Sequence, residues 1–367
     1  MKNFLSIGLT FCLLVNCGNS KKQENIPTSE GESANIAKRV LTNKLQFPWE
    51  ILWGPDNMIW FTERGGTISK IDTGTGKITR LLKIGEVVSN GEGGLLGMAL
   101  DPEFEKKPFV YVGYNYEDGL GNYWERIVRF HYLHSALSEP FVLMDHINAA
   151  GIHNGCRLLF IEGKLFFSTG DASNQSNSQD LSKLNGKILR INKDGSIPAD
   201  NPFPGSPVWS YGHRNPQGLV YANKIFYSSE HGPDTDDEIN IIEKGRNYGW
   251  PDVKGYCDGE DEKKFCEKYN VKEPIKAWTP TVAVCGLDYY DKDRIPEWKN
   301  SLLLCTLKGS RLIQLKLSED KKRIISSKEY FANEFGRLRD ICISPDGKVY
   351  LCTSNGDKDV IVELKAR

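Results

Sequence analysis

The fold can be predicted from one stretch of the chain, LRDICI-SPDG-KVYLCT, which spans residues 338–353. Two runs rich in Ile, Leu, Val, Cys and Tyr flank the turn sequence Ser344-Pro345-Asp346-Gly347. Aliphatic, β-branched and aromatic residues on either side of a Pro/Asp/Gly turn are typical of a β-hairpin. The second run ends in a small polar residue, Thr353.

The same pattern occurs six times, and this repetition predicts the architecture. The expected hairpins lie at residues 49–62, 96–112, 158–169, 218–229, 286–306 and 338–353. Apolar residues show no sustained 3.6-residue period, and the hairpin spacing matches the length of a four-stranded blade with loop insertions. We therefore expect an all-β, six-bladed β-propeller of four-stranded antiparallel blades rather than a large sandwich. Loops from every blade would meet at one end of the central channel.

The N-terminus predicts export. Met1-Lys2 precedes an apolar run from Phe4 to Val15, which is too short to span a bilayer but suits a signal peptide. The run ends at Cys17 and resembles a bacterial lipobox, although Asn16 departs from the small residue usual there. We expect residues 1–17 to be a lipoprotein signal peptide ending at a lipidated cysteine. An uncleaved hydrophobic anchor and an ordinary signal peptide are the alternatives.

This interpretation divides the rest of the chain into two parts. Residues 18–36 are polar and are expected to form a flexible tether, and residues 37–367 to form the propeller. The protein would be lipid-anchored to a bacterial membrane, facing the periplasm or the cell surface, and would touch the membrane only through this anchor.

Charge and cysteine content narrow the class of protein further. The 47 basic and 48 acidic residues give a net charge of −1, without the basic excess that a nucleic-acid-binding protein needs. Cys257 and Cys266 share a polar loop and are the best candidate disulfide, since export permits disulfides. The expected free, buried thiols are Cys156, Cys285, Cys305, Cys342 and Cys352.

Polar segments at the ends of the predicted hairpins carry the candidate chemistry. His153 could act as a general base, because imidazole titrates near neutral pH, and Asp171 could orient it. Oxygen ligands of the kind that calcium binds occur in Asp234–Glu238. A cluster of cations that could bind a polycarboxylate or phosphate comprises Arg214, Lys308, Arg337 and Arg339. Taken singly, each of these features could equally be a structural hydrogen-bond partner or a solvated loop.

Four motifs resemble those of a known family. They are GEGGLLG (91–97), YGHRNPQGL (211–219), EHGPDTDDE (230–238) and NYGWP (247–251). In this order they are similar to the soluble glucose/sorbosone dehydrogenases, which are aldose dehydrogenases that depend on pyrroloquinoline quinone (PQQ) and have a six-bladed propeller fold. The likeness runs from about Leu45 to the C-terminus.

The resemblance implies a role for each matching residue. His153 corresponds to the catalytic base and Asp171 to its acidic partner, while Arg214 and Asn215 correspond to residues that contact the quinone oxygens. The residues implied to pair with the PQQ carboxylates are Lys308, Arg337 and Arg339. The backbone carbonyls implied for a cofactor-bridging calcium (Ca²⁺) belong to Gly232 and Pro233, and a second, structural calcium is implied at Asp237, Glu238 and Tyr248.

The chain departs from the family pattern at Glu92, an implied cofactor contact where the family often has an amide. A carboxylate there would face a carboxylate-rich cofactor. The family likeness as a whole implies oxidation of the C1 hydroxyl of an aldose to a lactone, with electrons passed to a quinone or a soluble acceptor. The alternatives are a calcium-dependent propeller lactonase or esterase, and a non-catalytic propeller that binds at a surface.

Overall fold

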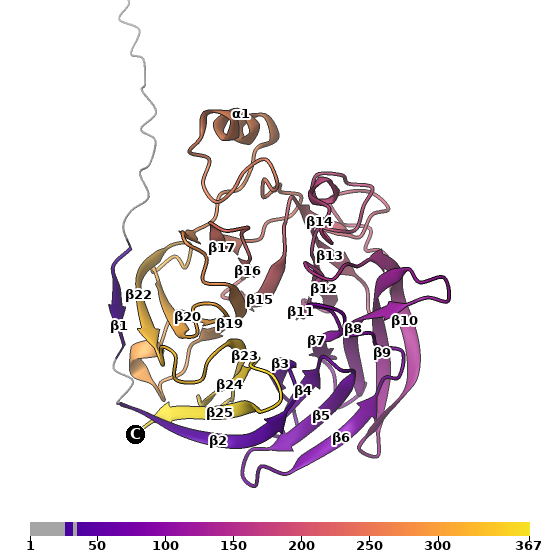
Figure 1. Cartoon of the computed structure of the whole chain (residues 1–367), viewed down its shortest axis with the longest axis vertical. Coiled ribbons are helices and arrows are strands. Elements are labelled where there is room, and N and C mark those ends of the chain that lie inside the picture. The colour runs from indigo at the N-terminus through magenta and orange to yellow at the C-terminus, as the bar shows by residue number, and fades with distance from the viewer. Residues whose placement is uncertain (1–25, 32–34) are drawn as a thin grey trace, which may run out of the picture.

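The computed structural model describes residues 26–31 and 35–367, and it confirms the six-bladed β-propeller. Six sheets surround a common centre, and each contains four antiparallel strands in meander order (Figure 1). The six predicted hairpins are the two innermost strands of the six blades. The predicted lipoprotein signal peptide and Cys17 lie outside the described residues and stay predictions.

The first three blades follow one another along the chain. Blade one contains β3 (Pro48–Trp53), β4 (Met58–Glu63), β5 (Thr67–Asp72) and β6 (Ile78–Lys83). Blade two contains β7 (Leu95–Leu100), β8 (Phe109–Glu117), β9 (Tyr123–Leu133) and β10 (Ala136–Asn148). Blade three contains β11 (Gly155–Ile161), β12 (Lys164–Thr169), β13 (Lys187–Ile191) and β14 (Val208–Tyr211).

The last three blades complete the ring. Blade four contains β15 (Pro216–Ala222), β16 (Ile225–Glu230), β17 (Asp237–Ile241) and β18 (Lys276–Trp278). Blade five contains β19 (Val284–Tyr290), β20 (Ser301–Thr306), β21 (Leu312–Leu317) and β22 (Ile324–Tyr330). Blade six contains β23 (Leu338–Ile343), β24 (Val349–Thr353), β25 (Asp359–Ala366) and, from the N-terminal side, β2 (Ile36–Leu45).

The ring closes within blade six, where the two ends of the chain share one sheet. The N-terminal strand β2 pairs antiparallel with the C-terminal strand β25, from Ile36 opposite Ala366 to Leu45 opposite Asp359. Closure packs blade six against blade one and covers the apolar faces that an open stack of blades would leave exposed.

The core lies between blades rather than within them. The described residues form six hydrophobic clusters, one at each interface between neighbouring blades. Trp60 of blade one packs with Met98 of blade two, and Leu303 of blade five packs with Leu351 of blade six. Burying one such side chain contributes about 1.5–3 kcal/mol, so stability depends on every interface being made.

Every inner strand has a bulge close to its first residue. The register shifts occur between Pro48 and Ile51, Leu95 and Met98, Gly155 and Leu158, Pro216 and Gly218, Val284 and Leu287, and Leu338 and Asp340. A bulge re-aims side chains and bends the strand. As a result, long polar side chains such as Arg157 and Arg339 enter the crowded centre of the ring, where both are buried.

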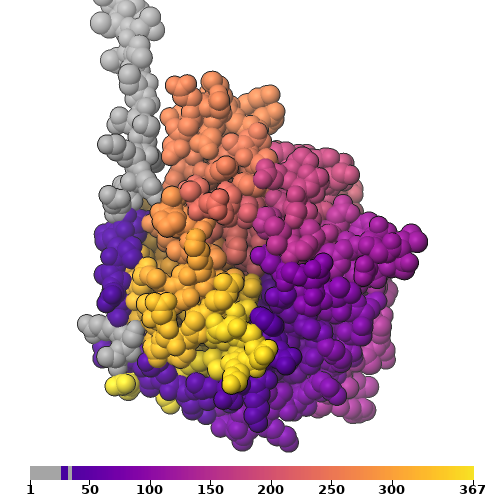
Figure 2. All heavy atoms as spheres, in the orientation of Figure 1, coloured from indigo at the N-terminus to yellow at the C-terminus, as the bar shows by residue number. Residues whose placement is uncertain are grey.

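Two elements differ from the sequence prediction. Part of the predicted tether, β1 (Thr28–Glu30), is a strand that pairs in parallel with β22 on the outer edge of blade five. Helix α1 (Glu260–Tyr269) occupies the predicted polar loop and projects beyond the ring (Figure 2). None of its residues is fully buried, and its apolar side chains, Phe265, Cys266 and Tyr269, are too few to predict a helix.

The cysteine predictions are confirmed for the described residues. Cys257 and Cys266 form a disulfide, and the five other cysteines in this part of the chain are free and buried. No helix within residues 26–31 and 35–367 is long and apolar enough to cross a membrane.

Shortening the N-terminus tests which strand the ring needs. Of the described residues, a chain beginning at Asn35 loses 26–31 with the exposed strand β1, and we expect it to unfold within about 2 °C of the full chain. A chain beginning at Gln46 also loses β2, which closes the ring, and we expect it to show no cooperative transition. Circular dichroism during heating distinguishes these outcomes. Equal behaviour of the two shortened chains would contradict this account of closure.

Candidate active site

The predicted pair of His153 and Asp171 is present at the start of blade three. His153 Nδ1 and Asp171 Oδ1 are 2.8 Å apart, and Asp171 is fully buried after the end of β12. Asp171 Oδ1 also accepts the Ser173 amide, and Oδ2 accepts the indole N–H of Trp250 at 3.0 Å. An ionised carboxylate only accepts hydrogen bonds, so His153 carries its proton on Nδ1 and leaves Nε2 free to take another.

Glu92 holds the loop on which His153 sits. The His153 amide donates to Glu92 Oε2 at 3.1 Å, and the Glu92 amide donates to the Gly151 carbonyl at 2.7 Å. These bonds stabilise the left-handed backbone of His153, which has φ +59°. Glu92 also lines the central pocket, but one of its oxygens serves the loop.

The central pocket has a volume of about 280 Å³ and lies where the inner strands begin. It is cationic: Arg64, Arg337 and Arg339 line it, with Glu92 as the single acidic lining residue. Burial and the neighbouring charge of Arg339 lower the pKa of Arg64 and of Arg337. Such crowding of like charges favours the binding of an anion.

Arg339 is the most deeply placed of these cations. Its NH1 donates to Gln217 Oε1 at 3.0 Å and contacts Cys285 Sγ at 3.1 Å. Its guanidinium also lies 5.8 Å from the centre of the Trp49 ring. Predicted partners Arg337 and Arg339 therefore share the pocket.

Lys308 and Asn215 stand apart from the pocket lining. Lys308 is exposed and donates to Thr281 Oγ1 at 3.3 Å, whereas its neighbour Leu307 lines the pocket. Asn215 is buried, and its Oδ1 accepts from the Gly155 amide at 3.0 Å and from Gln217 at 3.1 Å.

A second, much smaller cavity of about 20 Å³ lies next to the pocket, and His231 lines both. Its other lining residues include the predicted Arg214, Gly232, Pro233, Glu238 and Tyr248, together with Glu230 and Trp250. Most of the residues implied for calcium are thus gathered beside the residues implied for the quinone.

Asp237, a predicted calcium ligand, is held by backbone amides. Its Oδ1 accepts the Gly232 amide at 2.9 Å, and its Oδ2 accepts the amides of Val282 and Ala283 at 2.8 and 2.6 Å. These bonds join the loop of blade four to the start of blade five, and the role of Asp237 as a calcium ligand stays a prediction. Asp237 is not among the residues that line the small cavity.

A buried and a half-buried carboxylate, Glu230 and Glu238, face this cavity from neighbouring strands. Glu230 on β16 is directly opposite Glu238 on β17, and both line the cavity. Burial, with the added repulsion of Glu230, raises the pKa of Glu238 well above its usual value. The Tyr248 hydroxyl donates to the Ile241 carbonyl, so only its backbone carbonyl is available as a ligand. Within the described residues, no three His, Cys, Asp or Glu side chains gather as a metal site.

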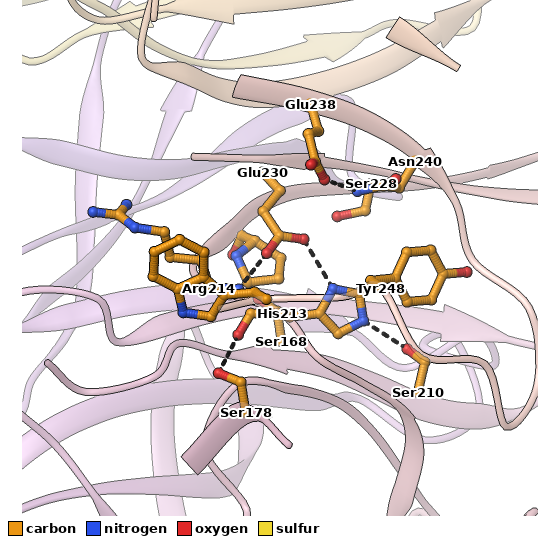
Figure 3. A network of polar contacts seen from close by, with 12 residues as sticks. Ser168, Ser178, Ser210, His213, Arg214, Ser228, Glu230, Glu238, Asn240 and Tyr248 are labelled. Atoms are coloured by element: carbon orange, nitrogen blue, oxygen red, sulfur yellow. Dashed lines mark hydrogen bonds and ion pairs between the residues drawn. The ribbon is translucent and has the colours of Figure 1, made fainter. Parts of the chain in front are cut away.

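A buried Ser–His–Glu array fixes the turn that carries Arg214 (Figure 3). Ser210 Oγ lies 2.9 Å from His213 Nε2, and His213 Nδ1 lies 2.8 Å from Glu230 Oε2. The other Glu230 oxygen accepts the Arg214 amide. Ser210 and His213 are fully buried, so this array has no access to a substrate and serves the structure.

Four buried nitrogens in or beside the two cavities have no hydrogen-bond partner among the described residues. Three are N–H donors, Arg214 Nε, Asn215 Nδ2 and Arg339 Nε, and the fourth is the imidazole nitrogen His231 Nε2. Buried donors are nearly always paired in native proteins, so these three favour the binding of an acceptor-rich ligand. Burial lowers the pKa of His231, which favours its neutral form.

Sequence reasoning did not single out several of these residues. His231 and Glu230 stand inside the quoted EHGP motif, and Trp250 inside NYGWP, so the motifs themselves were a signal. Arg64 directly follows β4 and is not part of a motif.

Comparisons with known proteins agree with this geometry. The family model for glucose/sorbosone dehydrogenases matches residues 45–362. The chain is 32% identical over 350 residues to the aldose sugar dehydrogenase YliI of Escherichia coli (strain K12), covering 89% of this chain and 92% of that one. It is 31% identical to quinoprotein glucose dehydrogenase B of Acinetobacter calcoaceticus, covering 88% and 86%.

A solved structure is similar along the same length. The PQQ-bound aldose sugar dehydrogenase of Streptomyces coelicolor superposes with a TM-score of 0.79 and 33% identity, covering 91% of this chain and 99% of that one. The chain belongs to the glucose/sorbosone dehydrogenase family, as its motifs indicated. It is therefore placed among oxidoreductases that act on sugars.

Substitution of Gly232 tests how tightly the small cavity is built. A Cβ on Gly232 would lie 1.9 Å from the Thr235 carbonyl oxygen and 2.6 Å from the Asp236 backbone. We expect Gly232→Ala to lower the free energy of unfolding by about 1–3 kcal/mol, because backbone must move to admit the methyl group. Gly85→Ala is the control, since nothing lies within 4 Å of its Cβ. Denaturant unfolding of both variants measures the difference, and an unaffected Gly232→Ala would refute the packing argument.

Proposed function

We propose that this protein is a PQQ- and calcium-dependent dehydrogenase that oxidises the C1 hydroxyl of aldoses to lactones. The observation that carries the proposal is the set of three buried N–H donors without acceptors, placed beside a cationic pocket. A small ligand with many anionic and carbonyl oxygens satisfies both features, and PQQ has three carboxylates and two quinone oxygens. The PQQ-bound relative from Streptomyces coelicolor supports the same cofactor.

The residues of the chain fit this cofactor in two groups. Arg337 and Arg339, with the newly identified Arg64, would hold its carboxylates in the central pocket, and the exposed Lys308 would act at the rim. The unpaired nitrogens of Arg214 and Asn215 would donate to the quinone oxygens. When bound, PQQ supplies a quinone carbonyl that accepts a hydride.

His153 would take the proton of the sugar hydroxyl on its free Nε2. Asp171 keeps the proton on Nδ1, orients the ring and stabilises the imidazolium that results. Trp250 and the Ser173 amide hold Asp171 in turn. Arg214 lies 5.3 Å from the Trp250 ring centre and would stabilise negative charge that develops on the quinone oxygen.

Calcium fits the small cavity beside this site. The carbonyls of Gly232 and Pro233 would hold one ion near the quinone, and Glu238 with the Tyr248 carbonyl would hold a structural one, to which Glu230 is now added. Hard carboxylate and carbonyl oxygens are the ligands that calcium prefers. An ion near the quinone would supply positive charge close to the developing oxyanion.

Further parts of the proposal concern partners and location. We propose that a quinone or a soluble carrier accepts the electrons, and that a lipid on Cys17 anchors the exported protein to a membrane. The pattern of the first residues supports the lipid anchor. The chain also lacks the excess of basic residues that a nucleic-acid partner would need.

Reconstitution tests the function directly. Purified protein loaded with PQQ and calcium should reduce an artificial dye when an aldose is added. His153→Ala should lower kcat by about 10²–10⁴-fold while PQQ still binds, because only the general base is lost. His146→Ala, at an exposed surface position, is the control and should keep full activity.

Other outcomes would identify the alternatives. Failure to bind PQQ would overturn the proposal. Lactone hydrolysis that needs calcium but not PQQ would identify a lactonase, and binding of a surface ligand without turnover would identify a non-catalytic propeller.

Calcium binding should depend on pH in a defined direction. In calcium-free protein the raised pKa keeps the Glu238 carboxyl protonated above its usual pH range. The protonated carboxyl favours folding at low pH, and this effect is lost as the pH rises through the pKa of Glu238 in the folded protein. Calcium must displace the proton, so its affinity should increase as pH rises from 5 to about 8. The thermal shift on calcium addition should grow over this interval and vanish in Glu238→Gln. A shift independent of pH would contradict the assignment.

A further inference from the structure

Lys187 is a buried cation that the proposed mechanism does not use. It is the first residue of β13, pairs with Thr169 across β12 and is fully buried. Its Nζ donates to three backbone carbonyls, those of Asn177 at 2.7 Å, Ser178 at 3.0 Å and Asn185 at 2.7 Å. An ammonium has three N–H donors, so this arrangement satisfies it completely.

The three carbonyls belong to the segment 171–186, which joins Asp171 to β13. The Asn177 side chain donates to the Asp171 carbonyl at 3.0 Å, and the Asn185 side chain donates to the Gly170 carbonyl at 3.2 Å. Asn177 and Asn185, whose carbonyls bond Lys187, therefore also bond the backbone of Asp171 and Gly170. Lys187 therefore joins the middle of the segment, at Asn177 and Ser178, to its C-terminal end at Asn185.

The third carbonyl connects Lys187 to the turn that carries Arg214. Ser178 accepts the Gly212 amide at 2.9 Å on its carbonyl, and its hydroxyl donates to the His213 carbonyl at 2.6 Å. The Asp171 amide in turn donates to the Arg214 carbonyl at 2.8 Å. Movement of the segment would therefore displace Asp171 and Arg214 together.

The same segment also supports Trp250, the indole that binds Asp171. Gln179, next to Ser178, donates to the Trp250 carbonyl at 2.7 Å. The Trp250 indole, which bonds the Asp171 carboxylate, is thus also joined to the segment 171–186.

We propose that Lys187 is a positioning residue that sets the place of Asp171 and Arg214 relative to His153. This inference rests on the proposed dehydrogenase function of the site. Burial lowers the pKa of Lys187 to about 7, so an ammonium here is costly compared with an apolar side chain of the same length. Its presence is explained by the carbonyls it bonds. With a Met side chain, Asn185 would lose its donor, and Asn177 and Ser178 would keep only backbone amides as donors, among them those of Asp180 and Gly212.

The test compares Lys187→Met with Lys70→Met, which removes a second mostly buried lysine far from the site. Lys70 bonds Asp56 and Tyr132 in blades one and two. In PQQ- and calcium-loaded protein below the unfolding temperature, Lys187→Met should lower kcat per bound cofactor at least tenfold, with sugar KM and PQQ affinity changed less than threefold. Lys70→Met should leave kcat unchanged, although both variants should unfold at lower temperature.

A second readout does not depend on activity. Amide hydrogen exchange of calcium- and PQQ-free protein should become at least tenfold faster in residues 171–186 and 212–214 of Lys187→Met, and not in Lys70→Met. If Lys187→Met fails to fold, Asn177→Ala replaces it, since that change removes only the bond to the Asp171 carbonyl. It should lower kcat about threefold or more.

The outcomes separate this inference from the proposed function. Wild-type protein that binds no PQQ or oxidises no sugar refutes the proposed function, and hydrogen exchange then decides alone whether Lys187 organises the segment. Full kcat in Lys187→Met, or in Asn177→Ala where the former does not fold, overturns the inference. So does unchanged exchange of residues 171–186, or a loss of PQQ affinity as large as the loss of kcat.

Discussion

The structure depends on how six inner strands meet around one axis. At this centre the Arg157 guanidinium of blade three lies 2.6 Å from Glu50 of blade one and 3.0 Å from Asp340 of blade six. Burial lowers the pKa of the Arg157 guanidinium, but the nearby carboxylates of Asp340 and Glu50 raise it by more. A single charge cluster thus joins blades that are far apart in the chain, and removal of one member would leave uncompensated buried charge.

The site is a consequence of this crowded centre. The bulge that begins each inner strand places a polar side chain inside the ring, and the loop before it stands at the mouth of the pocket. Arg157 donates to the Gln217 carbonyl at 2.8 Å, and Gln217 accepts from Arg339. The central charge cluster is therefore continuous with the cations that line the pocket. The residues that hold the blades together here are bonded directly to residues that line the pocket.

The sequence was informative where a local pattern determines the outcome. All six hairpins were predictable because the two inner strands of each blade are the most apolar, and His153 and Asp171 because they flank one hairpin. Helix α1 has few apolar side chains and β1 is only three residues long, so neither left a pattern. The bonds from Asp237 to the amides of Val282 and Ala283 could not be predicted, because those amides are distant in the sequence. His231 lines two cavities only after blades four and five come together.

The pairing of β2 with β25 means that the ring has no intrinsic first blade. Ile36 and Ala366 are direct neighbours in one sheet, so a short peptide joining these two residues would not disturb the blades. New ends could then be opened at a tight turn on the face opposite the pocket, such as Glu162-Gly163 between β11 and β12. The order of the blades along the chain is therefore not required by the fold, and a circularly permuted chain could form the same pocket.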